Sequence, residues 1–261
     1  MRRFYIISAL IAGLLLLIIL LPVPEAFTLP MLLLVIAIYA ALLVYGASRI
    51  DSNFFIRALC RRNTTERKLA ITFDDGPHGE RSEEILMILR EYECKASFFL
   101  IGSQAEKHPE ILKMMLEDGH LLGNHSYSHS NYFPLYSRSR IRSELKKTNG
   151  ILEVATSAPI RFFRPPFGVS NPRIAGGMKG SGMEVAGWSI RSFDTRNEAA
   201  EKVVNRILRK MEPGAVILLH ESSEHILEIL LSILPAIQEA GYQCITLDQM
   251  FPSNAGFGSG S

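Results

Sequence analysis

Two long uncharged runs near the N-terminus constrain the fold of this chain more than any other feature. Residues 4–21 and 29–45 contain no charged side chain, and each is about as long as the roughly 17–25 residues that an α-helix needs to cross a bilayer. Pro22-Val23-Pro24-Glu25 separates them, a sequence typical of a tight turn. We therefore predict a transmembrane helical hairpin over residues 1–46 that anchors the chain in the cell (inner) membrane, with the lipid bilayer as its partner.

Two other interpretations of this segment stay open. The first run has the positive start of a signal peptide, Arg2-Arg3, and could be cleaved, and the second run could lie at the membrane interface. Against cleavage, the apolar core is long for a signal peptide, and Pro24-Glu25-Ala26 is a poor cleavage site.

The charges that flank the two runs predict an orientation. Arg2 and Arg3 precede the first run, arginines follow the second from Arg49 onward, and the connecting loop holds only Glu25. The positive-inside rule places both ends of such a hairpin, and the domain after it, in the cytoplasm. A cleaved first segment would permit a domain on the outer side, so the side of the membrane stays open.

About 200 residues follow the hairpin, enough for one sizeable domain. Apolar runs and amphipathic stretches alternate there, which predicts an α/β fold with a mostly parallel sheet, open or closed into a barrel. We expect a linker over 47–66, the domain over 67–252 and a flexible Gly/Ser-rich tail over 253–261. The expected strands cover 68–73, 96–100, 121–124, 160–164, 184–188, 215–219 and 243–247, and the expected helices 82–92, 103–117, 138–155, 199–211 and 224–240.

Charge and cysteine content exclude several classes of protein. The net charge is only +2, and no basic stripe with interleaved aromatic residues is present, so nothing indicates a nucleic-acid partner. Cys60, Cys94 and Cys244 form neither a CxxC pair nor a zinc-finger spacing. This sparse, odd set argues against a disulfide framework.

Polar residues collect where the expected strands end. They occur at 72–76, 125–129, 164–167, 188–194 and 218–220. Because the carboxyl ends of parallel strands meet at one edge of a sheet, these segments should converge there.

A metal site is the first chemistry that these residues indicate. His125 and His129 are four apart, so a helical turn would put both on one face. Two imidazoles and one carboxylate, such as Asp75, with an open fourth position make a catalytic metal site. Either signal alone is weak, because an isolated HxxxH pair or an Asp-Asp-Gly-Pro turn is common. Their joint occurrence at successive strand ends favours the metal site.

Taken together, the five polar segments resemble the motifs of the polysaccharide deacetylases, the NodB-homology family, also called carbohydrate esterase family four. TFDDG at 72–76, HSxxH at 125–129, RxPF at 164–167, an aspartate motif ending at Asp194 and LLH at 218–220 appear in family order. The resemblance covers about residues 68–251. It implies a distorted (β/α) barrel and metal-dependent hydrolysis of the N-acetyl amide of an amino-sugar glycan.

The resemblance also implies the central roles in catalysis. Asp75, His125 and His129 look like the ligands of one divalent metal ion, Asp74 like the general base and His220 like the general acid. The ligand set suits zinc, and cobalt, nickel or iron would also fit. Proton transfers by a base and an acid are typically worth about 10²–10⁴-fold each.

Four further residues take supporting roles by the same resemblance. Arg164 resembles the arginine that orients the catalytic aspartate, and Asp194 the carboxylate that tunes the acid. Leu218 resembles the apolar residue beneath the acetyl methyl, and the backbone N–H of Phe167 a donor to the oxyanion. Apart from this resemblance, Trp188, the sole tryptophan, ends an expected strand, where packing is the favoured explanation, and it is also a candidate for substrate binding.

One motif departs from the family pattern. Arg191 and Thr195 stand where the family commonly has an aspartate and a tryptophan that lines the groove. The acceptor is therefore left open between an N-acetylated glycan, such as peptidoglycan or another polysaccharide, and a lipid-linked amino sugar. The alternatives are a related amidase acting on a non-sugar amide and a non-catalytic sugar-binding membrane protein.

Overall fold

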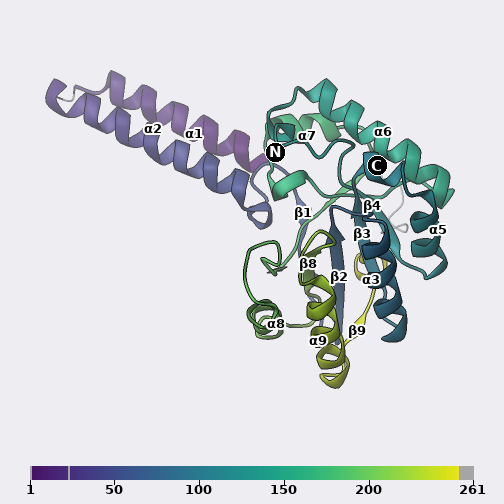
Figure 1. Ribbon diagram of the computed structural model, residues 1–261. Coiled ribbons are helices and arrows are strands. Elements are labelled where there is room, and N and C mark those ends of the chain that lie inside the picture. Colours follow the sequence, from purple (N-terminus) through teal and green to yellow (C-terminus); the bar gives the residue numbers. More distant parts are fainter. Residues whose placement is uncertain (1, 23, 253–261) are drawn as a thin grey trace, which may run out of the picture.

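The computed structural model describes residues 2–22 and 24–252. The tail predicted at 253–261 and Val23 of the predicted turn lie outside the described residues. Two long helices, α1 (Arg2–Leu20) and α2 (Glu25–Ser48), run side by side and project from the domain as a hairpin (Figure 1). The hydroxyls of Ser8 and Tyr39 share a hydrogen bond of 2.7 Å between the two helices.

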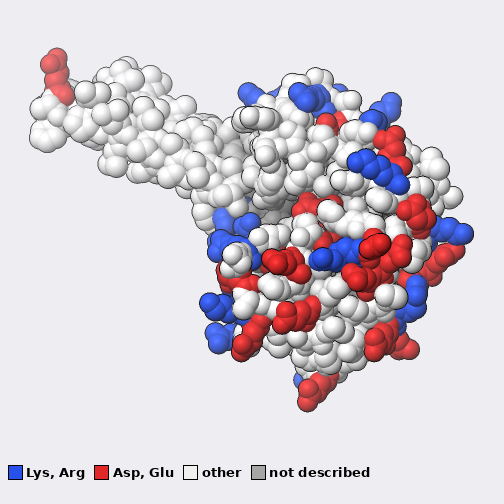
Figure 2. Space-filling model, viewed as in Figure 1, with Lys and Arg blue, Asp and Glu red and all other residues white. Residues whose placement is uncertain are grey.

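The surface of this hairpin is almost entirely apolar. Figure 2 shows it nearly free of charged side chains, whereas both signs of charge cover the visible face of the domain. The candidate spans have mean hydropathies of 2.5 and 2.6 and are hardly buried by the rest of the chain. Their length and composition fit two membrane spans, and the same features also fit a signal sequence.

The domain is built on one parallel sheet. Its strands are β1 (Ala58–Leu59), β2 (Lys68–Asp74), β3 (Ala96–Leu100), β4 (Leu121–Asn124), β5 (Phe162–Phe163), β6 (Glu184–Ala186), β7 (Ile190–Arg191), β8 (Val216–His220) and β9 (Gln243–Cys244). They are ordered β1-β6-β5-β4-β3-β2-β8-β7, with β9 beside β2. β7 pairs with β8 at one end of this order but follows β6 by only a few residues, so the sheet curls to bring the two strands near each other; the N–H of Ser189, which lies between them in the chain, donates to the carbonyl of Val216 at 3.0 Å. The predicted distorted barrel is thus confirmed.

Helices cover the outside of the curled sheet. They are α3 (Glu80–Glu91), α4 (Gly102–Ala105), α5 (Pro109–Glu117), α6 (Arg138–Thr156), α7 (Pro172–Met178), α8 (Ala200–Leu208), α9 (Ile226–Glu239) and α10 (Leu247–Met250), with short 3₁₀ turns at Ile50–Ser52, Phe133–Leu135 and Pro166–Gly168. Because side chains alternate across a strand, Ile71 and Phe73 of β2 join the apolar core shared with α3 and α9. Thr72 and Asp74 point the other way, into the barrel.

Several segments differ from the sequence expectations: α7 and β7 were not expected, and the strand expected over 243–247 ends at Cys244. The helix expected over 103–117 is split into α4 and α5, because Pro109 starts a new helix and holds His108 out of helical geometry. The expected linker over 47–66 packs with the domain, since β1 pairs with β6 and both Phe54 and Phe55 are buried. The two buried phenylalanines hold the segment against the domain although the segment also contains several arginines.

The base of the hairpin is fastened to one particular loop of the domain. The N–H of Ser170 donates to the carbonyl of Ala47 at 3.0 Å, and its hydroxyl to the carbonyl of Gly46 at 3.1 Å. A Cβ at Gly46 would come within 2.5 Å of the Phe54 ring, so only glycine permits this approach. The hairpin therefore meets the domain beside the loop that follows β5.

Candidate active site

The carboxyl ends of the strands bring the predicted site residues to one edge of the sheet. Asp74, the last residue of β2, lies directly opposite His220, the last residue of β8. A cleft of about 320 Å³ opens at this edge. Eight of the ten predicted residues line it: Asp74, Asp75, His125, His129, Phe167, Trp188, Leu218 and His220. A larger groove of about 1160 Å³ elsewhere on the domain contains none of them.

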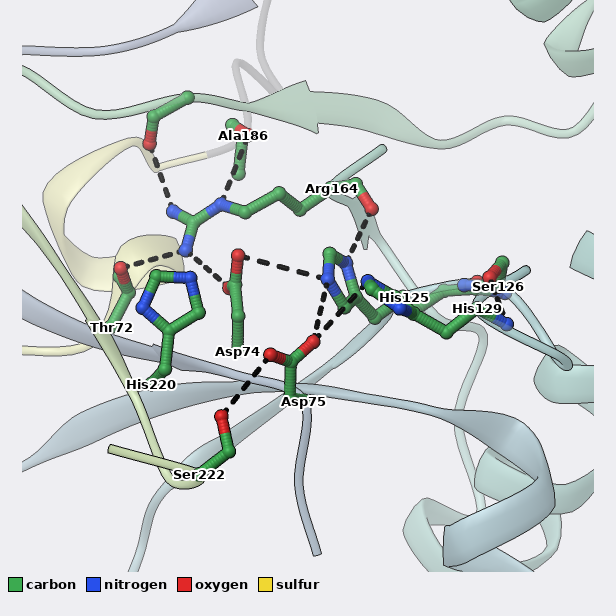
Figure 3. Close-up of polar contacts among 12 residues, drawn as sticks. Thr72, Asp74, Asp75, His125, Ser126, His129, Arg164, Ala186, His220 and Ser222 are labelled. Carbon is green, nitrogen blue, oxygen red and sulfur yellow. Dashed lines mark hydrogen bonds and ion pairs between the residues drawn. The ribbon is translucent and has the colours of Figure 1, made fainter. Parts of the chain in front are cut away.

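Three potential metal-ligand atoms converge in this cleft (Figure 3). Nε2 of His125 and Nε2 of His129 lie 3.5 and 3.2 Å from Oδ1 of Asp75. Nδ1–H of His125 donates to the carbonyl of Arg164 at 2.7 Å, which leaves the lone pair of Nε2 in a neutral imidazole for a metal. Such a backbone bond to the second nitrogen is typical of histidines that bind metal.

The protonation states of these groups suit a cation as well. Burial and the neighbouring His125 lower the pKa of His129 to about 4, so its imidazole is neutral at pH 7. Burial opposes the charge of Asp75, but the surrounding imidazoles hold the pKa of that carboxyl well below its usual range. The two imidazoles and the carboxylate of Asp75 are a donor set that zinc accepts with a position left open.

The loop that carries the histidine pair is not helical, so the expected helical turn is wrong. Ser126 and His129 have positive φ angles of 66° and 45°, which interrupt any right-handed helix. Side chains satisfy the loop N–H groups instead: Asn124 accepts from Ser126 at 2.8 Å, and Glu144 of α6 accepts from Ser128 at 2.8 Å. These bonds to α6 and β4 bring both imidazoles into the cleft.

Asp74 is held by a fully buried arginine. One terminal nitrogen of Arg164 donates to Oδ1 of Asp74 at 2.7 Å and to the hydroxyl of Thr72 at 2.8 Å, and the other donates to the carbonyl of Gly187 at 2.9 Å. The guanidinium also lies over the ring of Phe99, 4.1 Å from its centroid. This arrangement fixes Oδ1 and leaves Oδ2 of Asp74 towards His125, at 3.8 Å.

His220 forms a second buried pair, with Asp194. Nδ1–H of His220 donates to Oδ1 of Asp194 at 2.9 Å, and the backbone N–H of His220 donates to Oδ2 at 2.7 Å. Burial by itself would lower the pKa of His220, but the hydrogen bond and charge of Asp194 outweigh it and raise that pKa above its usual value. The imidazole is thus prepared to carry a proton, with Nε2 as the atom available to a substrate.

The remaining predicted residues shape the walls of the cleft. Phe167 has a φ of 62°, which is strained for a bulky residue, and its ring lies 5.0 Å from that of His129. A Cβ at Gly168 would come within 2.2 Å of Trp188, so the tryptophan packs directly on this loop. Leu218 is buried at the wall of the cleft. The roles of these residues stay predictions.

Several residues at or near the site were not among the predicted ones, and three of them are charged. Arg191 and Arg196 both line the cleft; Arg191 lies in the one motif that departs from the family pattern, which was a signal for it, whereas Arg196 lies just after that motif. Glu221 is fully buried and accepts a hydrogen bond from Ser82. The sequence could have indicated it by its position, because Glu221 is a charged residue directly after His220, a predicted site residue at the end of an expected strand.

Comparison with known proteins identifies the family. The family model described as polysaccharide deacetylase matches residues 61–186. A peptidoglycan-N-acetylglucosamine deacetylase from Bacillus cereus is 33% identical over 191 residues, which cover 72% of this chain and 69% of that protein. The chain belongs to the polysaccharide deacetylase family. Some other family members are longer, and the matched part of the present chain spans only 39% of their length.

Solved structures agree with this assignment. The Bc1960 peptidoglycan N-acetylglucosamine deacetylase is 31% identical with a TM-score of 0.70, over 74% of this chain and 91% of that one. A family pseudoenzyme from Bacillus anthracis, BA3943, is 28% identical with a TM-score of 0.67, over 73% of this chain and 67% of that one. The predicted family and fold are confirmed, and with them the enzyme class, a hydrolase of carbon–nitrogen bonds other than peptide bonds.

Proposed function

We propose that the chain is a membrane-anchored N-deacetylase of an amino sugar. The observation that carries this proposal is the convergence of three arrangements in one cleft: the Asp74–Arg164 pair, the His220–Asp194 pair and the ligand atoms around Asp75. The cleft of about 320 Å³ is at the small end of ligand sites, which suits one sugar ring with its acetamido group.

One divalent ion would be held by Asp75, His125 and His129. When bound, it supplies a Lewis acid that polarises the acetyl carbonyl and acidifies water. Zinc suits the donor set best, and cobalt, nickel or iron also fit it. The orientation of His125 by the Arg164 carbonyl and the neutral state of His129 support this assignment.

Asp74 takes the proton from the attacking water. Arg164 immobilises one carboxylate oxygen, so the other is presented to the cleft in a single orientation. Such preorganisation saves the reorganisation that a mobile carboxylate would need at the moment of reaction.

His220 returns a proton to the amine as the amide C–N bond breaks. Asp194 keeps the imidazole protonated and holds its orientation through two hydrogen bonds. The backbone N–H of Phe167 stabilises the oxyanion, and Leu218 packs beneath the acetyl methyl. The products are acetate and a free amino sugar.

The hairpin over 1–46 anchors the catalytic domain over 67–252 to the cell membrane, with 47–66 packed against the domain. The arginines that flank the hairpin favour the cytoplasmic side. A reporter fused after Phe251 tests this orientation. Alkaline phosphatase activity at that position, without fluorescence from a cytoplasm-only reporter, would contradict the cytoplasmic assignment.

The deacetylase activity is tested with the full chain, purified in detergent and loaded with zinc. Amine and acetate release from N-acetylglucosamine oligomers should exceed release from small non-sugar amides. Asp74→Asn and His220→Ala should each retain the metal and lose most turnover, because neither completes the ligand set. Near-wild-type kcat in either variant excludes that residue from the mechanism. Turnover of only the non-sugar amides would identify an amidase, and sugar binding without turnover a non-catalytic protein.

A further inference from the structure

Two solvent-exposed arginines line the catalytic cleft. Arg191 ends β7 and Arg196 lies in the loop that follows, and both face the cleft that also contains Asp74 and His220. Within residues 2–22 and 24–252, no carboxylate lies within ion-pair distance of either guanidinium. Arg206, close by, differs in this respect because it pairs with Glu198.

The ring of Phe193 packs against both guanidiniums and also against that of Arg206, whose guanidinium carbon lies 5.4 Å from its centroid. The guanidinium carbon of Arg191 lies 4.8 Å from the centroid of Phe193, and that of Arg196 lies 4.1 Å from it. Phe193 has a φ of 59°, an unusual conformation for a bulky residue. The loop therefore adopts a strained backbone conformation at the residue that brings two like charges together.

An anion would stabilise this arrangement, because two exposed guanidiniums lie beside one ring and the nearby Glu198 makes its ion pair with Arg206. Burial and the charge of Arg196 lower the pKa of Arg191, as expected for neighbouring guanidiniums. Arginine stays charged at any physiological pH, so the repulsion cannot be relieved by losing a proton. A neutral glycan in the cleft would partly desolvate both charges and offer them no counter-charge.

We propose that the substrate is an N-acetylated amino sugar that carries a phosphate ester, and that Arg191 and Arg196 bind the phosphate while the acetamido group lies between Asp74 and His220. This inference rests on the proposed deacetylase function and specifies its substrate class. A phosphate offers enough acceptor oxygens for two planar guanidiniums at once, whereas one carboxylate is already satisfied by a single bidentate arginine.

The position of the hairpin is consistent with a phosphate that joins the sugar to a lipid. Ser170, which fastens the base of α2 to the domain, lies three residues from Phe167 in the wall of the cleft. The cleft thus lies beside the segment proposed to enter the bilayer. A soluble sugar phosphate would present the same anionic group, so the experiment has to separate the two sources.

Binding is measured first, because it does not depend on turnover. The full chain with Asp74→Asn, zinc-loaded in detergent, is titrated calorimetrically with N-acetylglucosamine 1-phosphate and with methyl N-acetylglucosaminide. We expect the phosphate to bind about 10-fold more tightly or better, a difference of about 1.4 kcal/mol, because its hydrogen bonds to the guanidiniums are charge-assisted. In the same background, Arg191→Gln and Arg196→Gln should each remove most of this preference. Lys202→Gln, which removes an exposed positive charge of α8 outside the cleft, should not change it.

Equal affinity for the two ligands would overturn the inference, and so would a preference that survives both arginine substitutions, because the zinc ion alone would then explain it. An arginine-dependent preference for N-acetylmuramic acid over the sugar phosphate would also overturn it, in favour of a carboxylate.

Turnover by the unsubstituted chain then separates the sources of phosphate. Faster amine release from phytanyl-phosphate-linked N-acetylglucosamine than from the sugar 1-phosphate indicates a lipid-linked substrate, and the reverse indicates a soluble one. Arginine-dependent binding without amine release from any substrate refutes the deacetylase proposal and leaves the phosphate site standing. Rapid deacetylation of neutral oligomers without a phosphate preference refutes the phosphate site and leaves the deacetylase proposal standing.

Discussion

Replacing Arg164 by methionine should reveal how strongly the buried ion pair supports Asp74, the proposed catalytic base. Arg164 is fully buried, and four hydrogen bonds connect it to Thr72, Asp74, Ala186 and Gly187. Methionine fills much of the same volume but donates no hydrogen bond. Asp74, itself almost completely buried, would keep a charge without a partner.

The expected cost is large. Removing one partner of a buried ion pair typically costs about 3–5 kcal/mol, chiefly because the remaining charge is uncompensated. For a domain of this size, each kcal/mol lowers the melting temperature by about 2–4 °C, so a loss of 4 kcal/mol corresponds to roughly 8–16 °C. Most turnover should disappear as well, because the carboxylate of Asp74 loses its fixed orientation.

A double-mutant cycle separates the unpaired charge from the lost packing. Asp74→Asn removes the charge, so the double variant should be more stable than Arg164→Met alone, with a coupling energy of about 1–3 kcal/mol. Arg164→Lys serves as the matched control, since it keeps the positive charge but cannot reach all four acceptors. We expect its stability to lie between those of wild type and Arg164→Met.

The assay uses the only tryptophan as its probe. Trp188 lies 5.7 Å from the Arg164 guanidinium carbon, measured to its ring centroid, so its fluorescence reports directly on this region. Unfolding is followed in detergent with a chelator present, because bound metal would add its own stabilisation. Strictly additive effects of Asp74→Asn and Arg164→Met would refute the argument that an unpaired buried carboxylate dominates the cost.

Three further predictions concern the same site. His125→Ala should lower metal content and activity together, as measured by atomic emission and amine release; full metal occupancy would show that His125 is not a ligand. Asp194→Asn removes the contact that raises the pKa of His220, so the acid should lose its proton at lower pH. The alkaline limb of the pH–rate profile should then shift downward, and an unchanged limb would contradict this role. Glu221→Gln should gain stability relative to wild type between pH 5 and pH 8. Burial raises the pKa of Glu221 to about 7, so the folded state binds more protons than the unfolded state and wild type loses stability as pH rises. Denaturation midpoints that keep a constant difference over this range would exclude the effect.

Local patterns in the sequence were sufficient for several elements. The strands at 96–100 and 121–124 were predicted with the bounds that β3 and β4 have, because short apolar runs between turn signals depend little on distant contacts. The two uncharged runs predicted α1 and α2, because length and apolar composition are also local properties of the sequence. The motifs identified the family and eight residues that line the cleft.

Contacts between distant residues depended on the curl and register of the sheet. The Arg164–Asp74 bond joins residues 90 positions apart, and no local periodicity encodes its length or its burial. Positive φ angles at Ser126 and His129 replaced the expected helical turn, because Asn124 and Glu144 bind that loop from other elements.

The placement of Arg191 and Arg196 on one ring was equally hidden in the sequence. Their charges are visible there, but whether an arginine pairs with a carboxylate or faces a cleft alone depends on which side chains the folded chain brings within about 4 Å. The family motifs therefore determined the reaction that this protein can catalyse. The tertiary structure decided which charges remain uncompensated in the cleft, since compensation is a property of neighbours in space and not of neighbours in the chain.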